Sequence, residues 1–342
     1  MTHDGILKEL ASEKYGFLKT DERLKGKTIL LGLGGSHAYG TSAEGSDIDL
    51  RGCALNSREE ILMGVDFDQY NDSGTDTVVY SFRKMLAMLA ECRPNAVEML
   101  GLKPEHYIVL TDTGKELLAN RDMFLSKRVI GSFGEYAHSH LRRLENRAAR
   151  QADAEKREEH ILRSIENAEH AFREKYFTYD PGAVRLYIDR SERKNLETEI
   201  FMDISLKHYP LRDYANMWDE MNGIVRSYAD IGKRNRHAAE HGKTGKQMMY
   251  MVRMLYMCLD ILEKGEIVTF REKEHDLLMD IRNGKYLDGE DRPVPEFYEM
   301  VADLEKKLEY AKRSTCLPDA PDYRRIREFM MDVNDRVVRG FL

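Results

Sequence analysis

Two acidic residues, Asp47 and Asp49, follow a glycine- and serine-rich segment near the start of the chain. They lie in and beside an apolar stretch, residues 48–54, that predicts a β-strand. Residues two apart in a strand point to the same face of a sheet, so both carboxylates would project together. Two negative charges held that close raise each other's pKa unless a cation lies between them. The pair therefore predicts a divalent-metal site, with exposed loop acids as the alternative.

Gly34, Gly35 and Ser36 come directly after another apolar run, residues 28–33, that predicts a buried strand. Glycines let a backbone approach a phosphate closely, and a helix that begins here would offer free N–H groups. We therefore expect Gly35 and Ser36 to bind phosphate, and a plain tight turn is the alternative. Two better-known phosphate loops do not fit: the dinucleotide fingerprint needs glycine at His37, and GxxxxGK[ST] does not occur.

The glycine–serine turn, an interval of eleven residues and the D-x-D pair together resemble the nucleotidyltransferase signature of the DNA polymerase beta superfamily. The resemblance implies that Asp47 and Asp49 bind two divalent ions, Mg²⁺ or Mn²⁺, which hold the triphosphate of an incoming nucleotide. It also implies a third acid on a neighbouring strand, which binds metal and helps to activate the acceptor hydroxyl. Our candidate is Asp76, at the start of the strand-like residues 77–80; the alternatives in the same segment are Asp66, Asp68 and Asp72.

Further segments narrow this resemblance. SHAYG, SDIDLRG, DTVVYSFRKM and the rear block that begins GKTGKQMMYMVRML are similar to the RNA-repair-associated (RNA-ligase-associated) predicted nucleotidyltransferases, over roughly residues 30–330. That family tends to read tyrosine–aspartate–x–lysine–histidine before its rear helix, whereas this chain has Lys246 followed by Gln247. A role of that histidine therefore does not transfer to this chain. The resemblance implies an RNA end as the acceptor, in repair or processing.

The elements that must position these residues indicate an α+β fold. Apolar and β-branched runs predict a small mixed sheet from strands at residues 27–34, 48–54 and 77–80. Helical spacing follows at residues 82–89 and 113–120. We predict a polymerase beta-like nucleotidyltransferase domain over residues 1–125, followed by a larger helical domain over residues 126–342 that closes the cleft.

In the rear half the strand signal nearly disappears. Long helices are predicted for residues 132–176 and 245–264, and a brief strand for residues 267–270. Between Arg226 and Lys246, six basic residues face two acidic ones, which suits a triphosphate or an RNA backbone. A solvated loop is the alternative for that segment. Lys246 and Arg253 are seven residues apart and share a helix face, which we expect to line the cleft and contact the nucleotide.

The composition restricts the class of protein. The net charge is −7, so a polyanion would have to bind a local basic patch. No run approaches the roughly 18 apolar residues of a membrane span, and the N-terminus lacks the apolar core of a signal peptide. The four cysteines are scattered, which argues against structural zinc and a disulfide framework. We therefore expect a cytoplasmic protein that does not contact the membrane.

The combined prediction is a metal-dependent nucleotidyltransferase of the EC 2.7.7 type. It would transfer a nucleoside monophosphate from a nucleoside triphosphate, such as ATP, to an acceptor hydroxyl, and release pyrophosphate. Two alternatives keep the reaction and change the acceptor: a small molecule of the aminoglycoside kind, or a protein side chain as in toxin-type members. A third alternative is a non-catalytic nucleotide-binding protein.

Overall fold

The computed structural model describes residues 3–65, 67–134, 183–190, 198–219, 222, 243–289 and 291–342. The chain forms two compact units. The first contains Met1–Leu141, Thr244–Leu287 and Val294–Leu342, and the second contains Arg142–Lys243 and Asp288–Pro293. Helices from the last third of the sequence thus belong to the same unit as the N-terminal sheet, which differs from the single division near residue 125 that we predicted.

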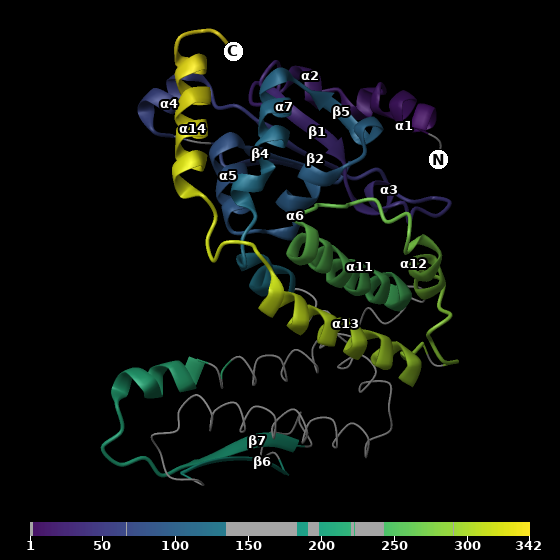
Figure 1. The fold of residues 1–342 in the computed structure, drawn as a ribbon, viewed down its shortest axis with the longest axis vertical. Helices are drawn as coiled ribbons and strands as arrows, with labels where there is room; N and C mark the ends of the chain where they lie inside the picture. Colours follow the sequence, from purple (N-terminus) through teal and green to yellow (C-terminus); the bar gives the residue numbers. More distant parts are fainter. Residues whose placement is uncertain are drawn as a thin grey trace. The chain divides into compact units, whose positions relative to one another are not determined.

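The first unit contains a five-stranded mixed sheet in the order β3-β4-β2-β1-β5 (Figure 1). Its strands are β1 (Thr28–Leu33), β2 (Leu50–Ala54), β3 (Gln69–Asp72), β4 (Thr77–Ser81) and β5 (Tyr107–Leu110). β2 pairs with β4 in parallel, and the other neighbours are antiparallel. The predicted α+β class, with a small mixed sheet in the front part and helices in the rear part, is confirmed.

The three strands predicted from apolar periodicity are present as β1, β2 and β4. Leu30, Leu31 and Leu33 of β1 are buried, as expected for a central strand covered on both faces. The sequence pattern missed β3 and β5, the two edge strands, which have four residues each. β3 reads Gln-Tyr-Asn-Asp, so its strand conformation depends on pairing with β4 and not on its own composition.

Helices cover the sheet as the sequence pattern predicts. Ser81 caps α5 (Phe82–Ala90) by accepting a hydrogen bond from the Lys84 N–H, and the apolar face of α5 is buried. α7 (Asp112–Ala119) follows β5. The other helices of this part are α1 (His3–Leu10), α2 (Phe17–Thr20), α3 (Gly35–Tyr39), α4 (Arg58–Met63) and α6 (Pro94–Val97), with the 3₁₀ helices η1 (Glu13–Tyr15), η2 (Glu98–Gly101), η3 (Pro104–His106) and η4 (Arg121–Phe124).

The long helix predicted at residues 245–264 is α11 (Lys243–Lys264), which ends at Gly265 in the left-handed conformation. Its methionines, including Met248 and Met254, are buried, so the methionine-rich stripe is core. The predicted strand at residues 267–270 is wrong: these residues have no regular secondary structure and belong to neither sheet. The chain continues through α12 (His275–Arg282), α13 (Pro295–Ser314) and α14 (Tyr323–Val338).

The second unit contains an antiparallel hairpin of β6 (Val184–Arg190) and β7 (Thr198–Ile204). Tyr187 lies opposite Phe201, and their rings stack with centroids 6.0 Å apart. The expectation that strands nearly disappear after residue 126 is wrong for this hairpin. Most of the helices predicted at residues 132–176, and the basic segment up to residue 242, lie outside the described residues.

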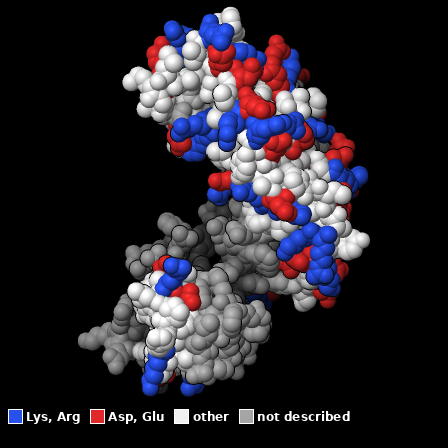
Figure 2. All heavy atoms as spheres, turned by 60° about the vertical axis from the view of Figure 1, so that its left-hand side comes forward, with Lys and Arg blue, Asp and Glu red and all other residues white. Residues whose placement is uncertain are grey.

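Charged side chains of both signs are interspersed over the face in Figure 2. This agrees with a chain in which 33% of residues are charged and the net charge is only −7. Within the described ranges, every helix is too short or too polar to cross a membrane.

Candidate active site

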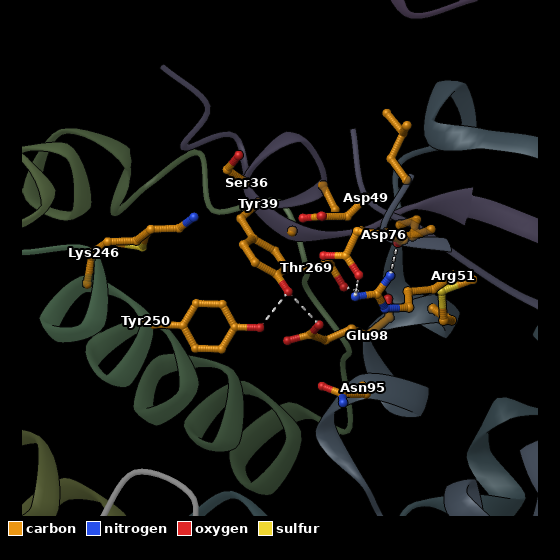
Figure 3. A pocket seen from close by; sticks show the side chains of 17 residues that line it. Ser36, Tyr39, Asp49, Arg51, Asp76, Asn95, Glu98, Lys246, Tyr250 and Thr269 are labelled. Atoms are coloured by element: carbon orange, nitrogen blue, oxygen red, sulfur yellow. Dashed lines mark hydrogen bonds and ion pairs between the residues drawn. The ribbon is translucent and has the colours of Figure 1, made fainter. Parts of the chain in front are cut away.

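The first unit contains a pocket of about 220 Å³ at the end of the sheet where β1 leads into α3 (Figure 3). Its lining comes from residues 33–102 and from residues 246–269, because α11 belongs to the same unit as the N-terminal sheet. Its polar lining residues are Ser36, Tyr39, Asp49, Arg51, Asp76, Asn95, Glu98, Lys246, Tyr250 and Thr269. Its other lining residues are Leu33, Gly34, Gly35, Ala38, Met99, Leu102 and Met249.

The parallel pairing of β2 and β4 brings two carboxylates to this pocket. Leu50 lies opposite Thr77 in the register, so the preceding residues, Asp49 and Asp76, lie side by side where the two strands begin. The Leu50 N–H donates to the Asp76 carbonyl at 3.3 Å. The structure therefore brings together Asp49 and our candidate for the third acid.

The two carboxyl groups shift each other's pKa in opposite directions. Burial, followed by the hydrogen bond and the charge of Asp76, raises the pKa of Asp49 to about 6. The hydrogen bond from Asp49 lowers the pKa of Asp76, and Arg51 and Lys246 lower it further. A pair that favours one positive charge between its members has the electrostatics of a cation site.

Gly35 permits this arrangement. Its φ of +54° is in the left-handed region, and a Cβ at this position would lie 1.6 Å from the Asp49 Oδ2 atom. The Gly34 N–H donates to the Asp49 carbonyl at 2.8 Å, which fixes the glycine turn against the strand that follows Asp49. Glycine is therefore required at position 35 by both the backbone conformation and the space that Asp49 occupies.

Two polar groups predicted to bind phosphate face the pocket. Ser36 is buried at the start of α3, and the Lys246 ammonium extends from α11 into the pocket (Figure 3). In the part of the chain that the structure describes, neither side chain has a hydrogen bond or an ion pair. Lys246 nevertheless lies close enough to lower the pKa values of Asp49 and Asp76 through its charge. Among the described residues, nothing therefore occupies these two groups, and both can contact a ligand.

Arg253 lies elsewhere than predicted. Its side chain is fully buried and pairs with Glu98, with 2.5 Å between Nη2 and Oε1, and it does not line the pocket. The guanidinium also lies 3.4 Å from the centre of the Tyr39 ring. Burial alone would lower the pKa of Arg253, but Glu98 and the tyrosines hold it above its ordinary value. Arg253 shares a helix face with Lys246 but lies about two turns further along α11, where its side chain is buried in the core.

The same buried pair holds the far wall of the pocket together. The Tyr39 hydroxyl donates to Glu98 Oε2 at 2.9 Å and lies 2.8 Å from the Tyr250 hydroxyl. The Thr269 hydroxyl donates to the Glu98 carbonyl at 2.7 Å. This network links α3, η2 and α11, so it positions the helix that carries Lys246 relative to the glycine turn.

Asp47 is exposed and does not line the pocket. β2 begins at Leu50, so both acids precede the strand, and the strict alternation that we expected to align Asp47 with Asp49 does not apply. No three acidic, histidine or cysteine side chains gather into a metal-binding group in the described ranges. Asp49 and Asp76 alone still fit Mg²⁺, which proteins commonly bind through one or two carboxylates together with substrate phosphates.

Sequence reasoning missed Arg51, Asn95, Glu98 and Tyr250. For Arg51 a signal existed: it is two residues after Asp49, a spacing that places side chains on one face of an extended chain. Asn95 and Glu98 lie on a short helix and a 3₁₀ turn without a chemical motif. The position of Glu98 depends on its contact with Arg253 of α11, 155 residues later in the sequence.

Comparisons with known proteins found two similarities. The profile of a family described as "RNA repair pathway DNA polymerase beta family" matches residues 11–200. The chain is also 22% identical over 311 residues to an uncharacterized 38.9 kDa protein in the nrdC-mobD intergenic region of Enterobacteria phage T4, covering 81% of this chain and 88% of the phage protein. No solved structure matches the chain.

Proposed function

This chain belongs to the RNA repair pathway DNA polymerase beta family, and on that basis we propose that it is a metal-dependent nucleotidyltransferase acting on RNA ends. Membership supports nucleotidyl transfer as the reaction class. The metal dependence, the nucleoside triphosphate and the RNA acceptor are our proposals. The observation that carries them is the pair Asp49 and Asp76, side by side in a pocket that also contains a glycine–serine turn and Lys246, which is unpaired among the described residues.

The pocket suits a nucleoside triphosphate. Ser36 and Lys246 are unpaired donors within the described structure, and Gly35 lines the pocket beside them. These three residues would hold the β- and γ-phosphates, with Lys246 neutralising charge that builds up on the leaving pyrophosphate. Met99, Leu102 and Met249 supply an apolar lining suited to a base or a ribose.

Asp49 and Asp76 would hold the metal ion, Mg²⁺ or Mn²⁺, which supplies charge stabilisation for the attacking and leaving oxygens. The reaction forms a bond between the acceptor oxygen and the α-phosphorus and breaks the bond between that phosphorus and the bridging oxygen to the β-phosphate. Asp76 is the more exposed carboxylate, and we assign to it the deprotonation of the acceptor hydroxyl. We also propose the second ion, with Asp47 as a further ligand; Asp47 is exposed and is not among the residues that line this pocket.

The test uses the full chain with each of the four α-labelled ribonucleoside triphosphates, Mg²⁺ and a pool of RNA with 3′-hydroxyl ends. We expect labelled RNA and released pyrophosphate, both lost in Asp49→Asn. Label on RNA from the variant at the wild-type rate would refute the assignment of the site. Pyrophosphate release that depends on an aminoglycoside or on protein, and not on RNA, would indicate that one of those molecules is the acceptor. Metal-dependent triphosphate binding without any transfer would indicate a non-catalytic binding protein.

A further inference from the structure

Arg51 makes several contacts with one residue of the candidate site, Asp76. Its Nη2 atom lies 3.1 Å from Asp76 Oδ1, and its Nη1 atom donates to the Asp76 backbone carbonyl. The same Nη1 donates to the Leu50 carbonyl at 2.8 Å. The planar fork of the guanidinium thus binds the carboxylate and the main chain of Asp76 at once, a geometry that a lysine ammonium does not reproduce.

Asp76 is a residue that needs such support. Its φ is +45°, in the left-handed region that aspartate adopts only occasionally. Its side chain is 59% exposed, whereas Arg51 is 23% exposed. An exposed carboxylate on a strained backbone has many alternative orientations, and each one that turns away from Asp49 removes a ligand from the site. The observed contacts of Arg51 restrict those orientations.

We propose that Arg51 is a positioning residue, which holds the Asp76 carboxylate beside Asp49 so that the two together bind a divalent cation. This inference rests on the proposed function, since it assumes that the two carboxylates are metal ligands. Arg51 acts through Asp76 and does not itself contact the metal or the nucleotide. Its location follows from the chain: it is two residues after Asp49, and its Cγ packs against Gly34.

The positioning role and simple electrostatics predict opposite changes in metal affinity when Arg51 is removed. Removing a positive charge near a cation site lowers the repulsion that the cation meets, so charge alone predicts tighter metal binding without Arg51. Loss of positioning predicts weaker binding, because removing a group that orients a metal ligand typically costs about 10- to 100-fold in metal affinity. The direction of the change therefore separates the two effects.

The experiment measures Mn²⁺ affinity of the full chain by isothermal titration, without nucleotide, at pH 7.5. The variants are Arg51→Met, Arg51→Lys, Asp76→Asn and the double variant Arg51→Met/Asp76→Asn. We expect Arg51→Met to bind Mn²⁺ about 10-fold or more weakly. We expect Arg51→Lys to bind more weakly than the wild type despite its retained charge. The double variant should bind no more weakly than Asp76→Asn, because Arg51 acts through Asp76.

The matched control is Arg336→Met. Arg336 is 25% exposed and pairs with Glu116. Its replacement therefore removes the same charge and a similar ion pair away from the pocket. Its Mn²⁺ affinity should equal that of the wild type. If Arg51→Met fails to fold by circular dichroism, Arg51→Lys and the double-variant comparison made with lysine decide the question.

The outcomes distinguish this inference from the proposed function. If the wild type binds no Mn²⁺, or if Asp49→Asn binds it equally well, the proposed metal site is wrong. The proposed role of Arg51 is then wrong as well, because it rests on that site. If the wild type binds Mn²⁺ and Asp49→Asn does not, the site stands. In that case, unchanged or tighter binding by Arg51→Met, or additive losses in the double variant, would overturn the positioning role alone.

Discussion

Asp49 and Asp76 lie side by side because β2 and β4 are parallel, with Leu50 opposite Thr77. The two acids are separated by β2, α4 and β3 in the sequence, yet each directly precedes its own strand. A parallel pair aligns the starts of both strands at one edge of the sheet, and this edge faces the pocket. The predictions below follow from this pair and from the groups around it.

Asp49→Asn should abolish nucleotidyl transfer, because a neutral amide cannot balance the charge of a divalent ion. A metal contributes several kcal/mol to the stabilisation of transition-state charge, so we expect the rate to fall by about 100-fold or more. Single-turnover transfer of label to RNA measures the rate. Asp112→Asn, which alters an exposed carboxylate paired with Lys115 on α7, should leave the rate unchanged.

The stability of the metal-free protein should depend on pH through Asp49. Between about pH 4 and pH 6 the folded protein retains a proton on Asp49, whose pKa is raised to about 6, whereas the unfolded chain has released it. Stability from this group therefore falls as pH rises through that window. The lowered pKa of Asp76 acts in the opposite direction, with stability lost only as pH falls below the ordinary aspartate value.

Urea unfolding in EDTA, from pH 4 to pH 8, tests this dependence against Asp49→Asn. Because the site is open to solvent, we expect the free energy of unfolding of the wild type to fall by on the order of 1 kcal/mol relative to that of the variant across this pH window. Added Mn²⁺ should restore the stability of the wild type at pH 7.5 and leave the stability of the variant unchanged. Parallel pH profiles for the two proteins would contradict the raised pKa of Asp49.

Gly35→Ala should both strain the backbone and displace Asp49. A Cβ at this position would overlap Asp49 Oδ2, in addition to the cost of about 1 kcal/mol for φ near +54°. Gly26→Ala is the matched control, because its φ is +68° and nothing lies within 4 Å of the added Cβ. We expect both variants to lose stability in urea, and only Gly35→Ala to lose Mn²⁺ binding. Equal Mn²⁺ affinity in the two variants would show that the contact with Asp49 is unimportant.

Lys246→Met should weaken triphosphate binding while the fold stays intact. Lys246 is exposed at the pocket and lacks an ion-pair partner among the described residues. The substitution therefore removes only the interaction of this side chain with the ligand. A single phosphate contact of this kind is worth about 1.5–3 kcal/mol, which raises KM for the triphosphate about 10- to 100-fold. Lys264→Met, on the same helix but paired with Asp260, controls for the loss of charge. An unchanged KM in Lys246→Met would remove this residue from the site.

Arg253→Met should destabilise the protein strongly. It leaves Glu98 buried without its main partner, and breaking such a pair costs about 3–5 kcal/mol. Arg325→Met removes an exposed pair with Asp122 and should cost at most about 1 kcal/mol. Urea denaturation of both variants measures the difference. Similar losses for the two would mean that the buried network contributes little to the stability of the first unit.

Local sequence patterns determined much of the first unit. The apolar runs of β1, β2 and β4 and the spacing in α5 and α11 depend on neighbours within a few residues, and all are present in the structure. The glycine–serine turn and Asp76 were also identified from the sequence, through local motifs and the family resemblance they carry. The edge strand β3 was missed, because its conformation depends on the partner strand more than on its own composition. The hairpin β6–β7 was also missed, although β6 reads VRLYIDR, an alternation of apolar and polar residues that is typical of a strand.

Only the tertiary structure decided which charged groups face the pocket. Lys246 and Arg253 have the same residue class and share one helix face, but the first ends in the pocket and the second pairs with Glu98, 155 residues earlier in the chain. Likewise, the parallel register and the contacts of Arg51 select Asp76 as the partner of Asp49, while Asp47 stays exposed. The sequence determined the reaction class through short motifs. The pairing of buried charges depends on long-range packing, which no local pattern encodes.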